Sequence, residues 1–320
     1  MKHLLIMLGI ICSTTMSLHA DEFPLTIKHK FGTTVIEEQP TRIASVDFTG
    51  ADDLLALDVQ PVTIRYWYGD YKRAVWPWAE PLLKDTPEIL RGDLNIEQIA
   101  STNPDVIIAL WSGIDQAMYD QLSLIAPVVA VPKNVGDYAM SWDDRALLTG
   151  IAIGKQNLAI SLIEGINNQL ADIAKKNPEW VGKTATMSNV RSDNIGIYSR
   201  HDIRAQLLSK IGFSVPKEID SLTEGENFVV NISFEAIELL DADLVVWMAY
   251  SGFDDIYKLT GRPFLNAAKE GREIFMGDQL ASALSHASLL SLPFAIEQLE
   301  PMIKAALDGD PNTHKDNRND

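Results

Sequence analysis

Arginine and aromatic side chains gather in a few short stretches of this chain of 320 residues. The densest stretch is Arg65-Tyr66-Trp67-Tyr68. Arginine forms paired hydrogen bonds to carboxylate, hydroxamate or catecholate oxygens, while Trp and Tyr cover flat apolar surface and offer a polar tip. This combination predicts a site for an organic ligand with acidic oxygens. The candidate ligand-binding residues are Arg65, Trp67, Tyr68, Trp111, Arg191, Tyr198, Arg200, Trp247 and Tyr250.

These residues follow the expected ends of strands, where parallel α/β sheets collect their ligands. Arg65 lies beside aromatic residues at such an end, which favours a role in binding. For Trp111 and Trp247, packing in the core is as plausible as a place in the site. We expect Arg65 and at least one of Arg191 and Arg200 to hold the acidic oxygens from opposite sides.

Sequence patterns that indicate catalysis or a metal site are absent. No Gly-rich phosphate loop, HExxH motif or nucleophile elbow occurs. The stretch Ser214-Val-Pro-Lys217 matches a Ser-x-x-Lys motif by its letters, but Pro216 is incompatible with the helix that this motif requires. His29, His201 and His286 are isolated in the sequence and lack the spacing of a zinc site. We expect no catalytic residue, metal or cofactor, although an enzyme built from scattered residues would leave no such pattern.

One stretch of sequence occurs twice. Glu97 and Glu235 each lie two residues after a helix-capping residue, Asn95 or Ser233, and each is followed by an Asp and an apolar run that ends near Trp. The spacing is constant, because 235 − 97 and 243 − 105 both equal 138. The repeat indicates a duplication at the level of a domain.

Short apolar strands alternate with helices in both halves of the chain, which is typical of βαβ units with mainly parallel pairing. Between the halves, apolar residues at steps of three and four predict a helix at 156–176, about 30 Å long at roughly 1.5 Å per residue. The expected fold class is α/β, with two lobes of mainly parallel sheets joined by this single long helix. The expected segments are a signal peptide at 1–20, an N-terminal lobe at 21–140, a helical connection at 141–176, a C-terminal lobe at 177–307 and a disordered tail at 308–320.

The first residues resemble a secretory signal, with Lys2, an apolar run at 4–11 and a cleavage site at Ala20. A lipoprotein signal would have a small residue before its cysteine, and Ile11 precedes Cys12, so cleavage near Ala20 is expected and lipidation of Cys12 is the alternative. Cys12 is the only cysteine, so the mature chain has no thiol chemistry. Removing residues 1–20 takes away one positive charge, so the formal charge of −17 becomes −18, which disfavours nucleic-acid binding.

Five stretches in this order resemble the periplasmic binding proteins of iron-siderophore ABC importers, a class that also serves haem and vitamin B12. The resemblance extends from about Pro40 to Ile303, and Val75-Trp-Pro-Trp78 and the stretch at 111–119 are most similar to the ferric-hydroxamate branch. The five stretches are at 40–61, 94–108, 125–129, 142–155 and 232–245.

The resemblance implies a ligand cleft between two lobes that a rigid helix connects. It also implies that Glu97 and Glu235, one on each lobe, contact arginines of an ABC permease in the inner membrane. The expected function is capture of a ferric siderophore in the periplasm by a monomeric protein, with iron present only in the bound chelate. The alternatives are a carrier of haem or of another iron or cobalt chelate, and a siderophore-processing enzyme that uses the same cleft.

Overall fold

The computed structural model describes residues 23–225, 227–250 and 252–313. The predicted signal peptide, Cys12 and the end of the predicted tail lie outside these ranges. Residues 308–313 form a turn in which Thr313 Oγ1 donates to Asp308 Oδ2 over 2.7 Å. Within the described ranges, no helix has both the length and the apolar character needed to cross a membrane.

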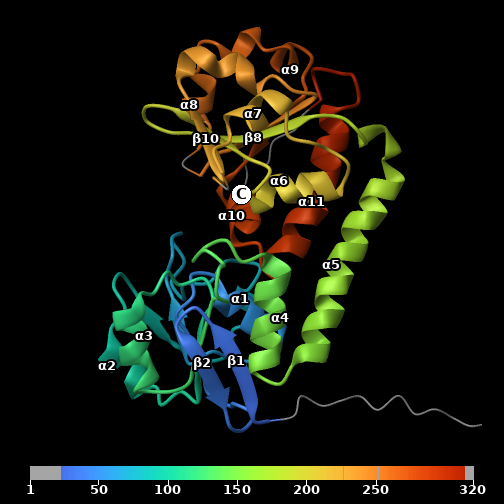
Figure 1. Cartoon of the computed structure of the whole chain (residues 1–320). Coiled ribbons are helices and arrows are strands. Elements are labelled where there is room, and N and C mark those ends of the chain that lie inside the picture. The colour runs from blue at the N-terminus through green and yellow to red at the C-terminus, as the bar shows by residue number, and fades with distance from the viewer. Residues whose placement is uncertain (1–22, 226, 251, 314–320) are drawn as a thin grey trace, which may run out of the picture.

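Two lobes lie at opposite ends of the molecule, and one long helix runs beside both of them (Figure 1). The helices of the N-terminal lobe and the connection are α1 (Gly50–Ala56), α2 (Ile96–Ser101), α3 (Gln116–Ser123), α4 (Trp142–Ala152) and α5 (Gln156–Lys176). Those that follow are α6 (Ile203–Lys210), α7 (Lys217–Leu222), α8 (Asp254–Tyr257), α9 (Asn266–Lys269), α10 (Asp278–His286) and α11 (Ser291–Ala306). Short 3-10 helices lie at η1 (Glu80–Leu82), η2 (Pro178–Trp180), η3 (Phe234–Leu240) and η4 (Arg262–Phe264).

The sheet of the N-terminal lobe is parallel throughout and has the strand order β5-β4-β3-β6-β7. Its inner strands are buried on both faces, as is usual for parallel strands covered by helices, and this explains their short apolar runs. The strands are β3 (Ile43–Ser45), β4 (Thr63–Arg65), β5 (Glu88–Leu90), β6 (Val106–Ala109) and β7 (Val128–Ala130). An antiparallel hairpin of β1 (Leu25–His29) and β2 (Gly32–Ile36) precedes them.

The sheet of the C-terminal lobe is mixed, with the order β10-β9-β8-β11-β12. Strands β8, β11 and β12 run parallel, but β9 is antiparallel to β8 and β10 is antiparallel to β9. The cause is the short connection at 191–194, closed by Arg191 N donating to Asn194 O over 2.9 Å, since a parallel crossover needs a dozen or more residues. The strands are β8 (Ala185–Val190), β9 (Ile195–Tyr198), β10 (Val229–Ile232), β11 (Leu244–Met248) and β12 (Glu273–Met276).

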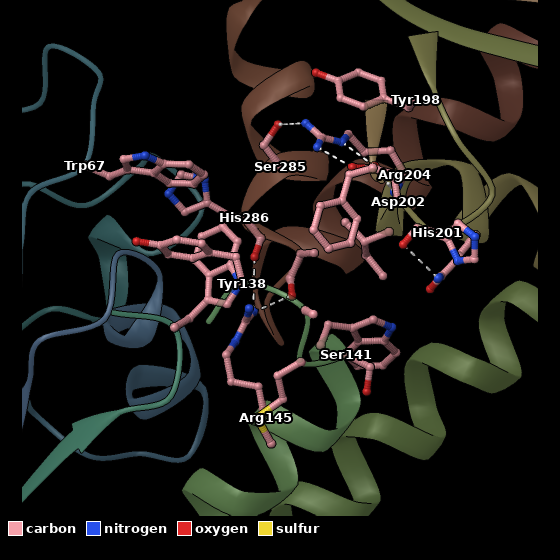
Figure 2. Close-up of a pocket in the computed structure, with 18 of the residues that line it drawn as sticks. Trp67, Tyr138, Ser141, Arg145, Tyr198, His201, Asp202, Arg204, Ser285 and His286 are labelled. Atoms are coloured by element: carbon pink, nitrogen blue, oxygen red, sulfur yellow. Dashed lines mark hydrogen bonds and ion pairs between the residues drawn. The ribbon is translucent and has the colours of Figure 1, made fainter. Parts of the chain in front are cut away.

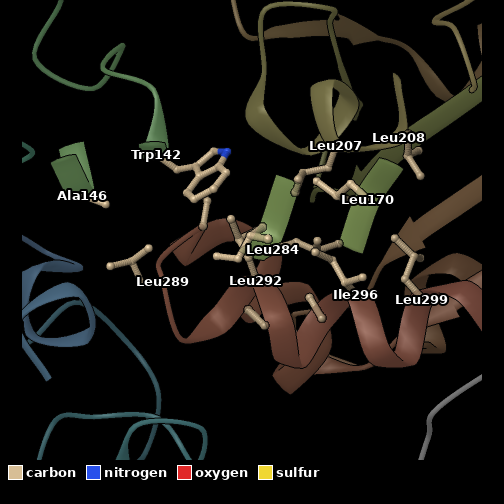
Figure 3. Close-up of a cluster of buried hydrophobic side chains, with 14 of the residues drawn as sticks. Trp142, Ala146, Leu170, Leu207, Leu208, Leu284, Leu289, Leu292, Ile296 and Leu299 are labelled. Atoms are coloured by element: carbon tan, nitrogen blue, oxygen red, sulfur yellow. The ribbon is translucent and has the colours of Figure 1, made fainter. Parts of the chain in front are cut away.

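The connection between the lobes is built on close helix packing. Helix α5 occupies the predicted range, and Ile166, Leu170 and Ile173 form part of its buried stripe. Where α4 meets α5, a Cβ added to Gly150 would lie 2.6 Å from the Ala159 Cβ, so only glycine permits this approach. Figure 3 shows side chains from α4, α5, α6, α10 and α11 meeting in one buried cluster. The hydrophobic core therefore continues from one lobe into the other beside the long helix.

Candidate ligand-binding site

A cavity of about 600 Å³ lies between the two lobes. The N-terminal lobe lines it with residues that follow β4 and β6, the start of α4 supplies one wall, and the C-terminal lobe supplies residues around β9, α6 and the end of β11 (Figure 2). The end of α10 completes the lining. The cavity thus lies where the carboxyl ends of several parallel strands converge, as expected for this class of sheet.

Five of the sequence-predicted residues line this cavity: Trp67, Tyr68, Trp111, Tyr198 and Tyr250. Three of these rings pack nearly at right angles, since the ring centroids of Trp67 and Trp111 lie 5.2 Å apart at 82° and those of Trp67 and Tyr68 lie 4.6 Å apart at 78°. Edge-to-face packing of this kind fixes the rings before a ligand arrives. The site therefore presents a preformed aromatic wall.

Arg65 does not line the cavity, contrary to the prediction. Its Nη1 donates to the backbone oxygens of Val46 at 3.3 Å and Ser112 at 2.8 Å, and its guanidinium lies 3.9 Å from the ring centroid of Phe48. Burial lowers the pKa of Arg65. The residue ties together the segments that follow β3 and β6, so its contribution to the site is structural.

The prediction that Arg191 or Arg200 lines the cavity is also wrong. Both side chains are held by partners outside the lining, even though His201 and Asp202, directly after Arg200, belong to it. Arg191 is exposed and donates to Asn231 Oδ1 over 3.3 Å. Arg200 pairs with Asp220 over 3.1 Å with 48% of its side chain exposed.

Trp247 belongs to the core, which corrects its predicted place in the cleft. It is 0% exposed and its Nε1 donates to Glu273 Oε1 over 2.7 Å. The reason is its position in β11, a central strand whose five residues are all buried between β8 and β12. Tyr250, two residues beyond the end of the strand, reaches the cavity instead.

Two other arginines line the cavity, and the sequence analysis missed both. Arg145 lies in helix α4 directly after Asp143 and Asp144 and is 3% exposed, and Arg204 lies in the first turn of α6, two residues after its capping residue Asp202. Aspartates are usual in the first turn of a helix, so these neighbours gave no sign that the arginines line a cavity. The candidates were chosen at the ends of strands, and this choice did not include either arginine.

Arg204 is held in a dense network. Its Nε and Nη2 donate to the two carboxylate oxygens of Asp202, both over 2.7 Å, and its Nη1 donates to Tyr250 Oη at 3.2 Å and Ser285 Oγ at 3.3 Å. The guanidinium also lies 3.7 Å from the ring centroid of Tyr198. The carboxylate of Asp202 raises the pKa of Arg204 against the effect of burial.

Arg145 faces a group of buried carboxylates beneath the cavity. Its Nε lies 3.2 Å from Asp53 Oδ2, and its Nη2 donates to the backbone oxygens of His286 at 3.1 Å and Ala287 at 2.7 Å. Burial raises the pKa of Asp47 and of Asp52 to about 6 in each case, although the positive charge of Arg145 lowers it in part. This network attaches the end of α10 to the N-terminal lobe.

Two histidines line the cavity in different surroundings. Burial lowers the pKa of His286 to about 3, so it is neutral, and its ring lies against those of Trp67 and Tyr68. The Nε2 of His201 is buried and has no hydrogen-bond partner among the described residues. Within the same residues, no group of three or more His, Cys, Asp or Glu side chains is arranged to hold a metal ion. The lining is thus suited to an organic ligand that offers oxygen atoms and apolar surface.

The model of the family described as periplasmic binding protein matches residues 43–280. The chain belongs to this family. Over 227 residues it is 26% identical to the ferric enterobactin-binding periplasmic protein FepB of Escherichia coli, covering 68% of this chain and 70% of that protein. The expected family is confirmed.

Two solved structures share the fold of this periplasmic binding protein. A periplasmic solute binding protein from Mycobacterium smegmatis superposes with a TM-score of 0.78 at 29% identity, covering 88% of this chain and 98% of that one. PiaA of Streptococcus pneumoniae, in complex with ferrichrome, superposes with a TM-score of 0.73 at 26% identity, covering 89% and 99%. The expected two-lobe α/β architecture is confirmed.

The two repeated glutamates of this periplasmic binding protein are exposed, one on each lobe. Glu97 is the second residue of α2, whose cap Asn95 accepts from Gln98 N over 3.0 Å. Glu235 is the second residue of η3, a 3-10 helix that replaces the expected second α-helix. The hydroxyl of Ser233 and the backbone amide of Glu235 lower the pKa of the Glu235 carboxyl. Both side chains are accessible to a partner.

Proposed function

We propose that this protein captures a ferric siderophore in the cavity between its lobes and delivers it to an ABC importer of the inner membrane. The observation that supports this proposal most strongly is the cavity itself, which combines an aromatic wall with two arginines in a member of the periplasmic binding protein family. One relative binds ferric enterobactin and one structural neighbour is a complex with ferrichrome.

The residues that line the cavity can bind a ferric chelate without large movements. Aromatic rings of the N-terminal lobe cover the organic part of a chelate, while the hydroxyls of Tyr198 and Tyr250 and the guanidinium of Arg204 approach its oxygens from the other lobe. Since both lobes contribute, a bound chelate bridges them. The continuous helix α5 and the shared core favour small closure motions, because bending a helix breaks backbone hydrogen bonds.

Delivery requires a matching partner and the correct compartment. We infer that Glu97 and Glu235 form ion pairs with arginines of the permease, one on each side of its two-fold axis. We also infer export by the segment at 1–20 with cleavage after Ala20. Mass spectrometry of the exported protein tests the cleavage: the expected chain begins at Asp21, and a lipidated Cys12 at the N-terminus would contradict it.

Titration of purified residues 21–320 with ferric siderophores, with the same siderophores free of iron, and with haem tests the proposed function. The ferric chelates absorb light and lie beside Trp67 and Trp111, so tryptophan emission should fall as the cavity fills. Binding of haem alone would replace the proposal with a haem carrier. Mass spectrometry of the recovered siderophore would reveal a processing enzyme, since the proposal predicts an unchanged mass.

A further inference from the structure

The charged side chains that line the cavity balance one another. Among its described lining residues, Arg145 and Arg204 are the arginines, no lysine occurs, and Asp202 and Asp278 are the carboxylates. His286 adds no charge, because burial lowers its pKa to about 3. The cavity is therefore close to neutral even though two cations are visible in its lining.

Both arginines already have anionic partners. Arg204 uses Nε and Nη2 on Asp202, and the side chains of this pair are 17% and 4% exposed. Arg145 pairs with Asp53, and Asp47 and Asp52 lie close enough for its charge to lower their pKa values. Neither arginine offers an uncompensated positive charge to a ligand.

The remaining arginines that the sequence suggested lie outside the lining of the cavity. Arg65 is turned to backbone oxygens outside the lining, and Arg191 and Arg200 are held by groups on the surface of the C-terminal lobe. An anion that leaves water needs a counter-charge at its destination, and a buried pair that already has its partner cannot provide one without losing that partner. Nothing in the lining would therefore compensate the free energy needed to remove a multiply charged anion from water. A neutral chelate would leave the ion pairs of both arginines intact.

From this balance, and on the basis of the proposed function, we propose that the cavity selects ferric chelates without net charge, of the tris-hydroxamate type, over anionic tris-catecholates. Three singly charged hydroxamates balance ferric iron, whereas three doubly charged catecholates leave an excess of negative charge. The lining suits the neutral class for a second reason: aromatic rings contact uncharged organic surface well, and the hydroxyls of Tyr198 and Tyr250 provide neutral polar contacts.

The test compares ferrichrome, a neutral hydroxamate chelate, with ferric enterobactin, an anionic catecholate, by calorimetry and tryptophan quenching. We expect ferrichrome to bind at least ~100-fold more tightly than ferric enterobactin. Its affinity should also change little with salt, because no net charge is screened.

A substitution separates charge from shape. Asp278→Asn removes one carboxylate from the lining and should improve the affinity for ferric enterobactin roughly tenfold relative to the affinity for ferrichrome. Glu238→Gln removes the same charge from the exposed surface outside the cavity and should change neither. Circular dichroism and thermal unfolding verify that each variant is folded.

The outcomes distinguish this inference from the proposed function. Ferric enterobactin binding as tightly as ferrichrome, or an equal effect of Asp278→Asn on both chelates, would overturn the charge selection and leave siderophore capture standing. Failure of both chelates and of ferric citrate to bind would overturn the proposed function and the inference with it.

Discussion

Single side chains at the ends of strands divide into those that face the cavity and those that hold the core. Trp111 and Trp247 lie at or near the ends of similar apolar runs at 106–111 and 244–248, yet Trp111 lines the cavity, while Trp247 is buried and its Nε1 donates to Glu273. The difference is one of position, since Trp111 lies beyond the end of β6 while Trp247 lies within β11.

The two tryptophans should therefore respond differently to substitution. Trp111→Ala should weaken siderophore binding about tenfold through lost ring contact and change the free energy of unfolding little. Trp247→Phe should lower the free energy of unfolding by about 1–3 kcal/mol, because a buried hydrogen bond is lost, and leave the affinity unchanged. Chemical denaturation measures the free energy of unfolding of both variants, and ligand titration measures their siderophore affinity. Equal effects of the two on binding would contradict the assignment.

Asp52 should make stability depend on pH. Its pKa is about 6 in the folded protein against 3.8 as the ordinary value, so between these values the folded state keeps a proton that the unfolded chain has released. Stability from this group is then greatest below about pH 3.8, falls as pH rises and levels off above about pH 6. The stability of the parent relative to Asp52→Asn should fall by about 2–3 kcal/mol from pH 4 to pH 7.

His286 contributes the opposite slope, because its folded pKa of about 3 lies below the ordinary 6.5 and its stabilisation is lost as pH falls. Comparison of parent and Asp52→Asn at each pH cancels this contribution. Denaturant unfolding at a series of pH values provides the measurement. A stability difference that is the same at pH 4 and pH 7 would show that Asp52 titrates normally.

At the scale of elements, the junction of α4 and α5 determines how the lobes are joined. Helix α5 presents a buried stripe to α4, α6 and α11, and the Gly150 backbone lies against Ala159 where the connection turns. Glycine is required here because of the close approach of the two helices. Gly165, on the exposed face of the same long helix, has no atom within 4 Å of an added Cβ.

These two glycines form a matched pair of substitutions to alanine. Gly150→Ala should destabilise the protein by about 1–3 kcal/mol, because the new methyl group forces α4 and α5 apart. Gly165→Ala should stabilise it by about 0.5–1 kcal/mol, since alanine favours a helix without meeting a neighbour. Thermal unfolding of the two variants checks the signs. If Gly150→Ala were as stable as the parent, the packing of the two helices could not depend on this contact.

At the scale of the whole molecule, two lobes of the same class each expose a glutamate at the second position of a helix. A carboxylate there also complements the helix dipole, by about 0.3–1 kcal/mol. That effect alone would account for a glutamate at each site. Docking to a permease with two-fold symmetry also accounts for the constant spacing of 138 residues between the two repeated stretches.

The double variant Glu97→Lys with Glu235→Lys separates these explanations. Docking predicts that iron uptake in cells falls strongly while siderophore affinity stays the same, because two ion pairs with the permease become repulsions. Glu238→Lys makes the same change of charge as Glu235→Lys alone, at another exposed residue of η3, and should leave uptake close to normal. Normal uptake by a folded, ligand-binding double variant would exclude the docking role.

The sequence by itself determined the local features of this protein. The steps of three and four predicted helix α5, the alternation of strands and helices predicted two α/β lobes, and polar aromatic residues after strand ends located Trp67, Trp111 and Tyr250 in the site. These features depend on residues close in sequence. The period of a helix and the composition of a strand end can be read directly from the order of residues in the sequence.

Only the tertiary structure decided strand direction, the face of each side chain and the pairing of charges. The ion pair with Asp220 holds the side chain of Arg200 outside the cavity that His201 and Asp202 line, and the neighbours of β11 buried Trp247. Arg145 became part of the cavity because Asp53, 92 residues before it, and His286 at the end of α10, 141 residues after it, supply its partners. Such contacts join distant segments, and the free energy of burying a cation depends on the carboxylates that the fold brings to it.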